Sequence, residues 1–131
     1  MKPLVRWTIG PCSSDLGYLS LRLSVQSMKR LLGTKVDYAI CYNNLSLKTI
    51  NCLPSVDILV DQSDYIGIYG DLSPIGPAWK LYPPRLRIES CEISLDNDLI
   101  LYDLPQDLID FFESDFFLIS ESYKRSYSGV L

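Results

Sequence analysis

Two carboxylates, Asp96 and Asp98, have the most definite chemical use in this sequence, because a single residue separates them between two apolar runs. In an extended backbone, side chains two positions apart point to the same side, so both carboxylates would share one face. Hard divalent cations take oxygen ligands, and Mg²⁺ commonly binds through one or two carboxylates while substrate phosphates complete its coordination. The triplet therefore predicts a Mn²⁺ or Mg²⁺ site that holds a diphosphate group.

A structural turn is the alternative interpretation of the same triplet. Asn and Asp side chains bond to their own backbone and tolerate left-handed conformations, so Asp96-Asn97-Asp98 is also a typical turn sequence. Its position favours the metal site. The triplet follows a series of alternating strand-like and helix-like segments, and ligands of open α/β sheets bind beyond the carboxyl ends of the strands.

The segments before the triplet alternate between the two patterns. An apolar, β-branched run over residues 4–9 predicts a strand, and helix N-caps at 13–15 followed by a broad apolar face predict a helix that ends at Gly33. Residues 34–42 and 56–60 predict two further strands, separated by a short helix over 46–51. This order predicts a Rossmann-like α/β fold with a mostly parallel sheet flanked by helices, and one domain over residues 1–131.

The segments after the triplet predict a strand over residues 99–102 and a helix from Pro105 to 112 or 113. A last strand is expected over 115–120, and residues 121–131 show no capping element. A long loop, residues 64–77, is rich in Gly, Pro, Asp, Ser and Tyr. Its length favours a functional loop over a plain connection.

Composition excludes several classes of protein and site. The net charge of −4 with no basic run argues against a nucleic-acid surface, and no apolar stretch reaches the length of a membrane helix. The N-terminus lacks the apolar core of a signal peptide, so a cytoplasmic protein is expected. Histidine is absent, and the four cysteines are widely spaced, which predicts reduced thiols and no zinc site.

Aromatic and cationic side chains follow the long loop. Trp79 offers a plane on which a nucleotide base could stack, and Lys80 offers a charge for a phosphate, although a core Trp beside a surface Lys is an equally good interpretation. Arg85 and Arg87 precede the fourth strand. Two arginines near a phosphate would help to bind it, but solvated surface charges explain them as well.

The predicted order of elements, together with Trp79-Lys80, Pro84-Arg85-Leu86 and residues 92–98, resembles the nucleotide-sugar-binding half of a GT-A fold glycosyltransferase. The resemblance spans residues 4–119 and is concentrated in the Asp-x-Asp motif. It implies a transferase that binds a uridine or guanosine diphosphate sugar. In such enzymes the first aspartate of the motif contacts the ribose or the metal, a role that falls to Asp96, and the last binds the metal, a role that falls to Asp98.

The resemblance also implies where the nucleotide would lie. In such enzymes the ends of the first strands hold the base and the ribose. The matching positions here are Thr8, Ile9, Tyr42, Asn43 and Gln62.

Members of that family usually continue into an acceptor-binding half, whereas this chain ends about one strand after the motif. We therefore expect donor binding, and at most slow hydrolysis of the donor, unless a homo-oligomer partner or a missing C-terminal half completes the cleft. A non-catalytic α/β domain with a structural Asp-rich turn is the first alternative. A phosphotransferase of the haloacid dehalogenase type is the second, disfavoured because its motif lies near the chain start and because Ile100 fills the fifth position.

Overall fold

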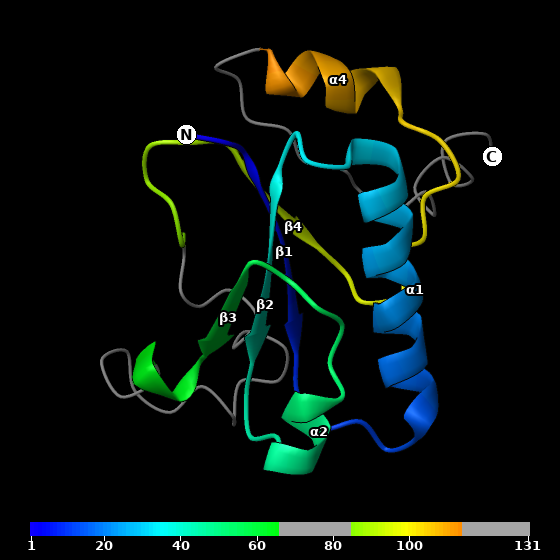
Figure 1. Ribbon diagram of the computed structural model, residues 1–131, viewed down its shortest axis with the longest axis vertical. Coiled ribbons are helices and arrows are strands. Elements are labelled where there is room, and N and C mark those ends of the chain that lie inside the picture. The colour runs from blue at the N-terminus through cyan, green and yellow to red at the C-terminus, as the bar shows by residue number, and fades with distance from the viewer. Residues whose placement is uncertain (66–84, 114–131) are drawn as a thin grey trace, which may run out of the picture.

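The computed structural model describes residues 1–65 and 85–113 (Figure 1). The elements in chain order are β1 (Leu4–Ile9), α1 (Asp15–Leu32), β2 (Asp37–Tyr42), α2 (Leu47–Asn51), β3 (Ile58–Asp61), β4 (Glu92–Leu95) and α4 (Gln106–Phe112). The alternation of strands and helices confirms the predicted α/β class. The strand predicted over 115–120 lies outside the described residues.

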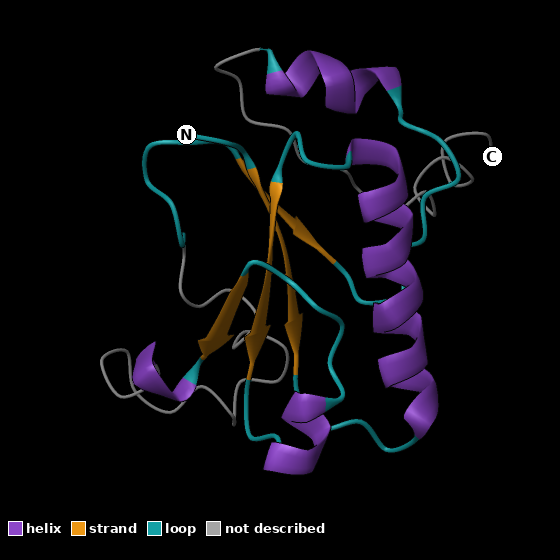
Figure 2. Cartoon of the chain, viewed as in Figure 1, coloured by secondary structure: helices purple, strands orange, loops and turns teal. Residues whose placement is uncertain are grey.

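The four strands form one sheet in the order β3-β2-β1-β4, and every neighbouring pair is parallel (Figure 2). This arrangement confirms the predicted parallel, Rossmann-like sheet. Strand β1 pairs with β2 from Leu4 opposite Asp37 to Ile9 opposite Tyr42, and with β4 from Leu4 to Trp7. Because β2 and β3 extend the sheet on one side of β1 and β4 lies on the other, the strand order reverses between β1 and β4.

Helix α1 covers one face of the sheet. Its buried apolar residues, including Leu21, Val25 and Met28, pack against Val5, Trp7 and Ile9 of β1 in one hydrophobic core. The helix ends at Gly33, whose φ of +53° is a left-handed conformation that glycine adopts without steric cost, as the sequence predicted. The Trp7 indole N–H donates to the Ser24 hydroxyl at 2.8 Å, so the largest core side chain has its polar atom paired.

The connection through α2 lies on the same face of the sheet as α1. The Ser46 hydroxyl accepts from the Thr49 backbone N–H at 3.2 Å, which confirms Ser46 as the predicted N-cap of α2. Arg22 and Lys29 of α1 donate to backbone carbonyls of Cys52 and Ser55 beyond α2. Both crossovers, through α1 and through α2, therefore run across one side of the sheet (Figure 1).

The opposite face of the sheet buries charge. The Arg6 guanidinium on β1 donates to the Glu92 carboxylate on β4 at 2.8 Å, and both side chains are at least nine-tenths buried. The second oxygen of Glu92 accepts the backbone N–H groups of Leu86 and Arg87 at 2.8 and 3.1 Å. One carboxylate thus ties the start of β4 both to β1 and to the turn that precedes it.

The strand predicted over residues 99–102 is wrong. This segment runs along α1, where its backbone groups bond to helix side chains instead of to a neighbouring strand. Ser24 donates to the Leu99 carbonyl, the Leu101 N–H donates to Ser27 at 3.2 Å, and Arg30 donates to the carbonyls of Leu101 and Tyr102. Since the backbone groups are satisfied in this way, the apolar run buries Leu101 against the core without extending the sheet.

Two strand boundaries differ from the prediction. Strand β2 begins at Asp37, not at residue 34, because β1 offers a partner only from Leu4 onward and the preceding residues follow the helix end. Strand β3 runs over Ile58–Asp61 instead of 56–60, opposite Ala39 to Tyr42. The predicted helix from Pro105 is confirmed as α4.

All four cysteines are described and free, in agreement with the prediction of reduced thiols. Of the four, Cys41 alone is fully buried, and Cys52 is exposed. Within residues 1–65 and 85–113, no helix is long and apolar enough to cross a lipid bilayer.

Candidate functional site

An open hollow of about 460 Å³ lies between the first turns of α1 and the segment that follows β4. Its lining residues are Ser14, Leu16, Gly17, Ser20, Asp96, Asn97 and Asp98. The hollow lies beyond the carboxyl ends of β1 and β4, where the strand order reverses. In open parallel sheets this crevice is the place where ligands bind. The structure therefore places the predicted Asp-x-Asp triplet at the position that the sheet topology favours.

The triplet itself is not the extended segment that the sequence predicted. Strand β4 ends at Leu95 opposite Trp7 of β1, and Asn97 and Asp98 form a turn in which the Leu99 N–H donates to the Asp96 carbonyl at 3.2 Å. The chain must leave the sheet here to reach the side of α1. Strand alternation therefore does not set the directions of the two carboxylates, although both are exposed and both line the hollow.

Sequence reasoning missed five of the seven lining residues as site residues: Ser14, Leu16, Gly17, Ser20 and Asn97. Asn97 lies between the two aspartates. Its side-chain carbonyl oxygen is buried and has no hydrogen-bond partner within the described part of the chain. Buried polar atoms are normally paired, so this oxygen can accept a hydrogen bond from water or a ligand in the hollow. For Asn97, the signal in the sequence was its position inside the triplet.

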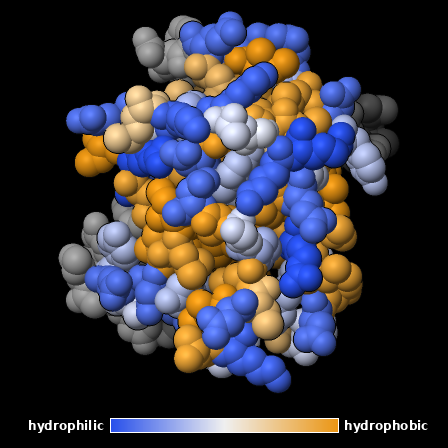
Figure 3. Space-filling model, in the orientation of Figure 1, coloured by the Kyte–Doolittle hydropathy of each residue, from blue (hydrophilic) through white to orange (hydrophobic). Residues whose placement is uncertain are grey.

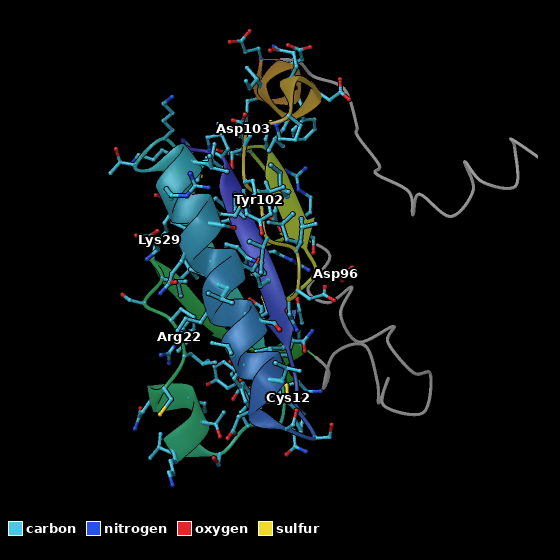
Figure 4. All side chains as sticks on the ribbon, turned by 90° about the vertical axis from the view of Figure 1, so that its right-hand side faces the viewer. Cys12, Arg22, Lys29, Asp96, Tyr102 and Asp103 are labelled. Carbon is cyan, nitrogen blue, oxygen red and sulfur yellow. The ribbon has the colours of Figure 1, made fainter. Side chains whose placement is uncertain are left out.

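Close packing fixes the loop between β1 and α1. A Cβ atom at Gly17 would lie 2.6 Å from the Cys12 sulfur, so no larger residue fits there without displacing that side chain. The Tyr18 hydroxyl accepts the Cys12 backbone N–H at 3.3 Å, and the thiol donates to the Gly10 carbonyl at 3.6 Å. Figure 4 shows Cys12 at this end of α1. Gly17 thus allows α1, which forms one wall of the hollow, to pack closely against the loop that holds Cys12.

Helix α1 begins without a side-chain cap among the described residues, because the Ser14 hydroxyl accepts no backbone N–H. The first four N–H groups of a helix have no partner within it, and together with the helix dipole they favour negative charge. Three carboxylates, those of Asp15, Asp96 and Asp98, lie at this end of the helix. The N-terminal end of α1 can therefore stabilise either the negative charge of these carboxylates or that of an anionic ligand in the hollow.

The described residues contain no group of three or more Cys, Asp or Glu side chains that could hold a metal ion. Two exposed carboxylates facing one hollow remain a suitable oxygen donor set for Mg²⁺ or Mn²⁺ if ligand phosphates and water complete the shell. Asp96 and Asp98 thus fit such an ion only as a pair that shares it with a ligand.

The residues expected to hold the nucleotide lie at the same sheet edge but are buried to different degrees. Backbone hydrogen bonds from Asn43 to Ile9 at 3.0 Å and from Gln62 to Tyr42 at 2.8 Å bring these strand ends together. The side chains of Thr8, Ile9 and Gln62 are buried, whereas those of Tyr42 and Asn43 are half-buried. None of the five is among the lining residues of the hollow.

Acidic residues surround the accessible part of this edge. Burial raises the pKa of the Tyr42 phenol, and the carboxylates of Asp61 and Asp64 raise it further. Asp61 is oriented by the Ser63 backbone N–H and hydroxyl, at 2.9 and 2.7 Å. The Tyr42 hydroxyl therefore stays protonated at neutral pH and can donate a hydrogen bond.

The arginines that precede β4 lie away from the hollow. The Arg87 guanidinium pairs with Asp37, the first residue of β2, at 2.6 Å and donates to the Lys2 carbonyl, which places it at the amino edge of the sheet. Arg85 donates to the Ser90 carbonyl. Neither arginine lines the hollow, which favours the alternative that they are not phosphate ligands. Trp79 and Lys80 lie outside the described residues.

Comparisons with protein-family models, with curated proteins and with solved structures give no match for this chain.

Proposed function

We propose that this protein binds a nucleotide-diphosphate sugar at the hollow between α1 and β4, together with Mn²⁺ or Mg²⁺, in the manner of the donor-binding half of a GT-A glycosyltransferase. One observation carries the proposal: Asp96 and Asp98 face a common hollow at the point where the order of parallel strands reverses. A metal held by two carboxylates would accept diphosphate oxygens as its remaining ligands.

The other walls of the hollow support an anionic ligand. The uncapped N-terminus of α1 offers backbone N–H donors, and Gly17 and Ser20 leave the approach unobstructed by large side chains. The unpaired Asn97 oxygen can accept a hydrogen bond from a ligand hydroxyl. Tyr42 and Asn43, half-buried at the end of β2, remain the expected contacts for the base and ribose.

Glycosyl transfer further requires an acceptor held in line with the anomeric carbon. We propose donor binding as the property of this chain, with transfer to an acceptor dependent on a cleft completed by further residues or by a second copy.

A non-catalytic α/β domain is the second candidate, and two observations favour it. The triplet forms a turn closed by the Leu99 N–H, and the positive end of the α1 dipole stabilises nearby carboxylates without any ligand. In that case Asp96 and Asp98 would only stabilise the turn and would bind no ligand.

Isothermal titration with UDP and GDP, each with and without Mn²⁺, separates the two candidates. We expect heat only when the metal is present. Asp98→Asn should abolish this heat, whereas Asp107→Asn, an exposed carboxylate on α4, should leave it unchanged. Equal heats with and without metal, or no heat in either, would rule out the metal-diphosphate site and leave the structural turn.

A further inference from the structure

Helix α1 carries an apolar stripe on the side that faces away from the sheet. We define the apolar stripe as Leu16, Leu19 and Leu23 together with Leu99 and Ile100, which are 67%, 51%, 42%, 41% and 40% exposed. The three helix residues follow a spacing of three and four, which places them on one face of a helix. Arg30, seven residues after Leu23 and therefore on the same face, bonds to the Leu101 carbonyl, so the segment with Leu99 and Ile100 lies beside α1.

The apolar stripe follows α1 instead of being scattered over the surface. Figure 3 shows apolar side chains along the outer edge of the molecule beside the N-terminal half of α1. Single exposed apolar residues are ordinary on protein surfaces, whereas contiguous apolar patches mark sites of association. The other large exposed residues, such as Leu47 on α2 and Ile88, lie on different parts of the chain.

Opposite charges lie at the two ends of the apolar stripe. At the N-terminal end of α1 are the carboxylates of Asp15, Asp96 and Asp98. At the C-terminal end are Lys29 and Arg30, in the last turn of the helix. Arg30 bonds to the Tyr102 carbonyl, so the segment that precedes Asp103 also lies at this end of the helix.

We propose that the apolar stripe is the contact between two copies of this chain, with the two α1 helices antiparallel about a two-fold axis between Leu19 and Leu23. In this arrangement Leu19 of each copy meets Leu23 of the other. The acidic end of one helix then lies beside the basic end of the other, so an isologous contact satisfies both the apolar and the charged residues. A parallel arrangement would instead bring like charges together.

The geometry of the helix supports this pairing. With the axis between Leu19 and Leu23 and a rise of 1.5 Å per residue, Asp15 of one copy and Arg30 of the second copy differ by only about 4 to 5 Å along the helix direction. That offset is within reach of an arginine side chain. Standard interfaces bury about 800 Å² on each partner, more than five side chains supply, so the flanking charges must contribute and the dimer should be weak.

Sedimentation equilibrium of the full chain over micromolar to millimolar concentrations tests the proposal without any donor, so its outcome is independent of the proposed function. We expect a monomer–dimer equilibrium. Leu19→Glu should weaken association by at least roughly tenfold, since it places a buried charge at the axis. Leu47→Glu, which changes a 73% exposed leucine on α2 in the same way, should leave association unchanged.

The antiparallel direction has its own test. Residues 15 and 30 of one α1 helix are about 22 Å apart, too far for a zero-length cross-link within one chain. In the Arg30→Lys variant, carbodiimide treatment should therefore join the Asp15 carboxylate to the new amine only between copies, and adding Leu19→Glu should remove the cross-linked peptide. A dimer without this cross-link would overturn the antiparallel arrangement.

Two results would overturn the contact itself: a monomer at every concentration, and a dimer that Leu19→Glu leaves intact. In the first case, a loss of thermal stability of the monomer on Leu19→Glu would mean that residues of the same chain cover the apolar stripe. The melting temperature of each variant, measured beside its association, distinguishes this outcome from a failure to fold.

Discussion

Both faces of the sheet are buried along β1 but are held together in different ways. On the face toward α1, Val5, Trp7 and Ile9 pack against helix side chains, and the Trp7 indole N–H is paired with Ser24. On the opposite face, an ion pair between Arg6 and Glu92 joins β1 to β4. Apolar packing tolerates small errors of geometry, whereas a buried charge is stable only while its partner stays in place.

The difference matters for the candidate site, because side chains on both faces hold β4, the strand that directly precedes Asp96. Ile93 and Leu95 of β4 pack against the core on the α1 side, while Glu92 holds the start of the same strand from the other side. The position of the carboxylates at the hollow thus depends on apolar packing and on one ion pair together.

Trp7→Ala should have the largest effect on the α1 face. It removes the largest core side chain and leaves the Ser24 hydroxyl without its indole donor, so we expect the free energy of unfolding to fall by about 3 to 5 kcal/mol. Urea unfolding followed by circular dichroism measures the change. A loss below about 1 kcal/mol would show that this face is not the main core.

Glu92→Ala should cost about as much on the opposite face, about 3 to 5 kcal/mol, because it leaves the Arg6 guanidinium buried and unpaired. Adding Arg6→Met to it should recover the part due to the charge. The backbone N–H groups of Leu86 and Arg87 would still lack their acceptor, so a deficit of about 1 to 3 kcal/mol should remain. If the double variant is no more stable than Glu92→Ala, the ion pair is not what makes Glu92 important.

Cys41, on the face with the ion pair, should make stability fall at high pH. Burial raises the pKa of its thiol to about 11, Glu92 adds to the shift and Arg6 opposes it. The ordinary value is 9.0, so the unfolded chain ionises first. The contribution is therefore complete below pH 9 and is lost as pH rises toward 11, by at most about 2 to 3 kcal/mol.

Urea unfolding of the wild-type chain and of Cys41→Ala between pH 8 and pH 11 tests this dependence. The free energy of unfolding should fall less steeply with pH in Cys41→Ala than in the wild-type chain, whatever the absolute stability of the variant. Alkylation of the native protein at pH 8 gives a second measurement, in which exposed Cys52 should react and Cys41 should be protected. Equal rates at the two thiols would contradict the burial of Cys41.

Asp98→Asn should have the smallest effect on stability, within about 0.5 kcal/mol, because the side chain is exposed and the turn bond is made by the Asp96 backbone carbonyl. Binding of UDP or GDP in the presence of Mn²⁺ should nevertheless be lost. A thermal melt beside the titration measures both properties. A variant that unfolds would show that the carboxylate holds the turn and has no separate binding role.

Local patterns in the sequence were enough to predict most of the elements near the site. Three local predictions are confirmed: the strand at the apolar run of β1, the helix that ends at Gly33 and the N-cap at Ser46. Each depends on residues that are close together in the sequence. The alternation of these elements also predicted a parallel sheet with its strand ends at one edge. The lining of the hollow by Asp96 and Asp98 agrees with that prediction.

What the sequence did not determine depends on residues that are far apart along the chain. All six residues of β1 are buried, so its pattern could not show which side chains face α1 and which face Glu92, 86 positions beyond Arg6. The apolar run after the triplet has the composition of a strand, but hydroxyl and guanidinium groups of α1 satisfy its backbone and hold it on the helix. Because the chain leaves the sheet after Leu95 to run along α1, it turns at Asp96. Local propensity determines whether a segment can be a strand or a helix, and only tertiary packing decides which backbone groups and charges become its partners.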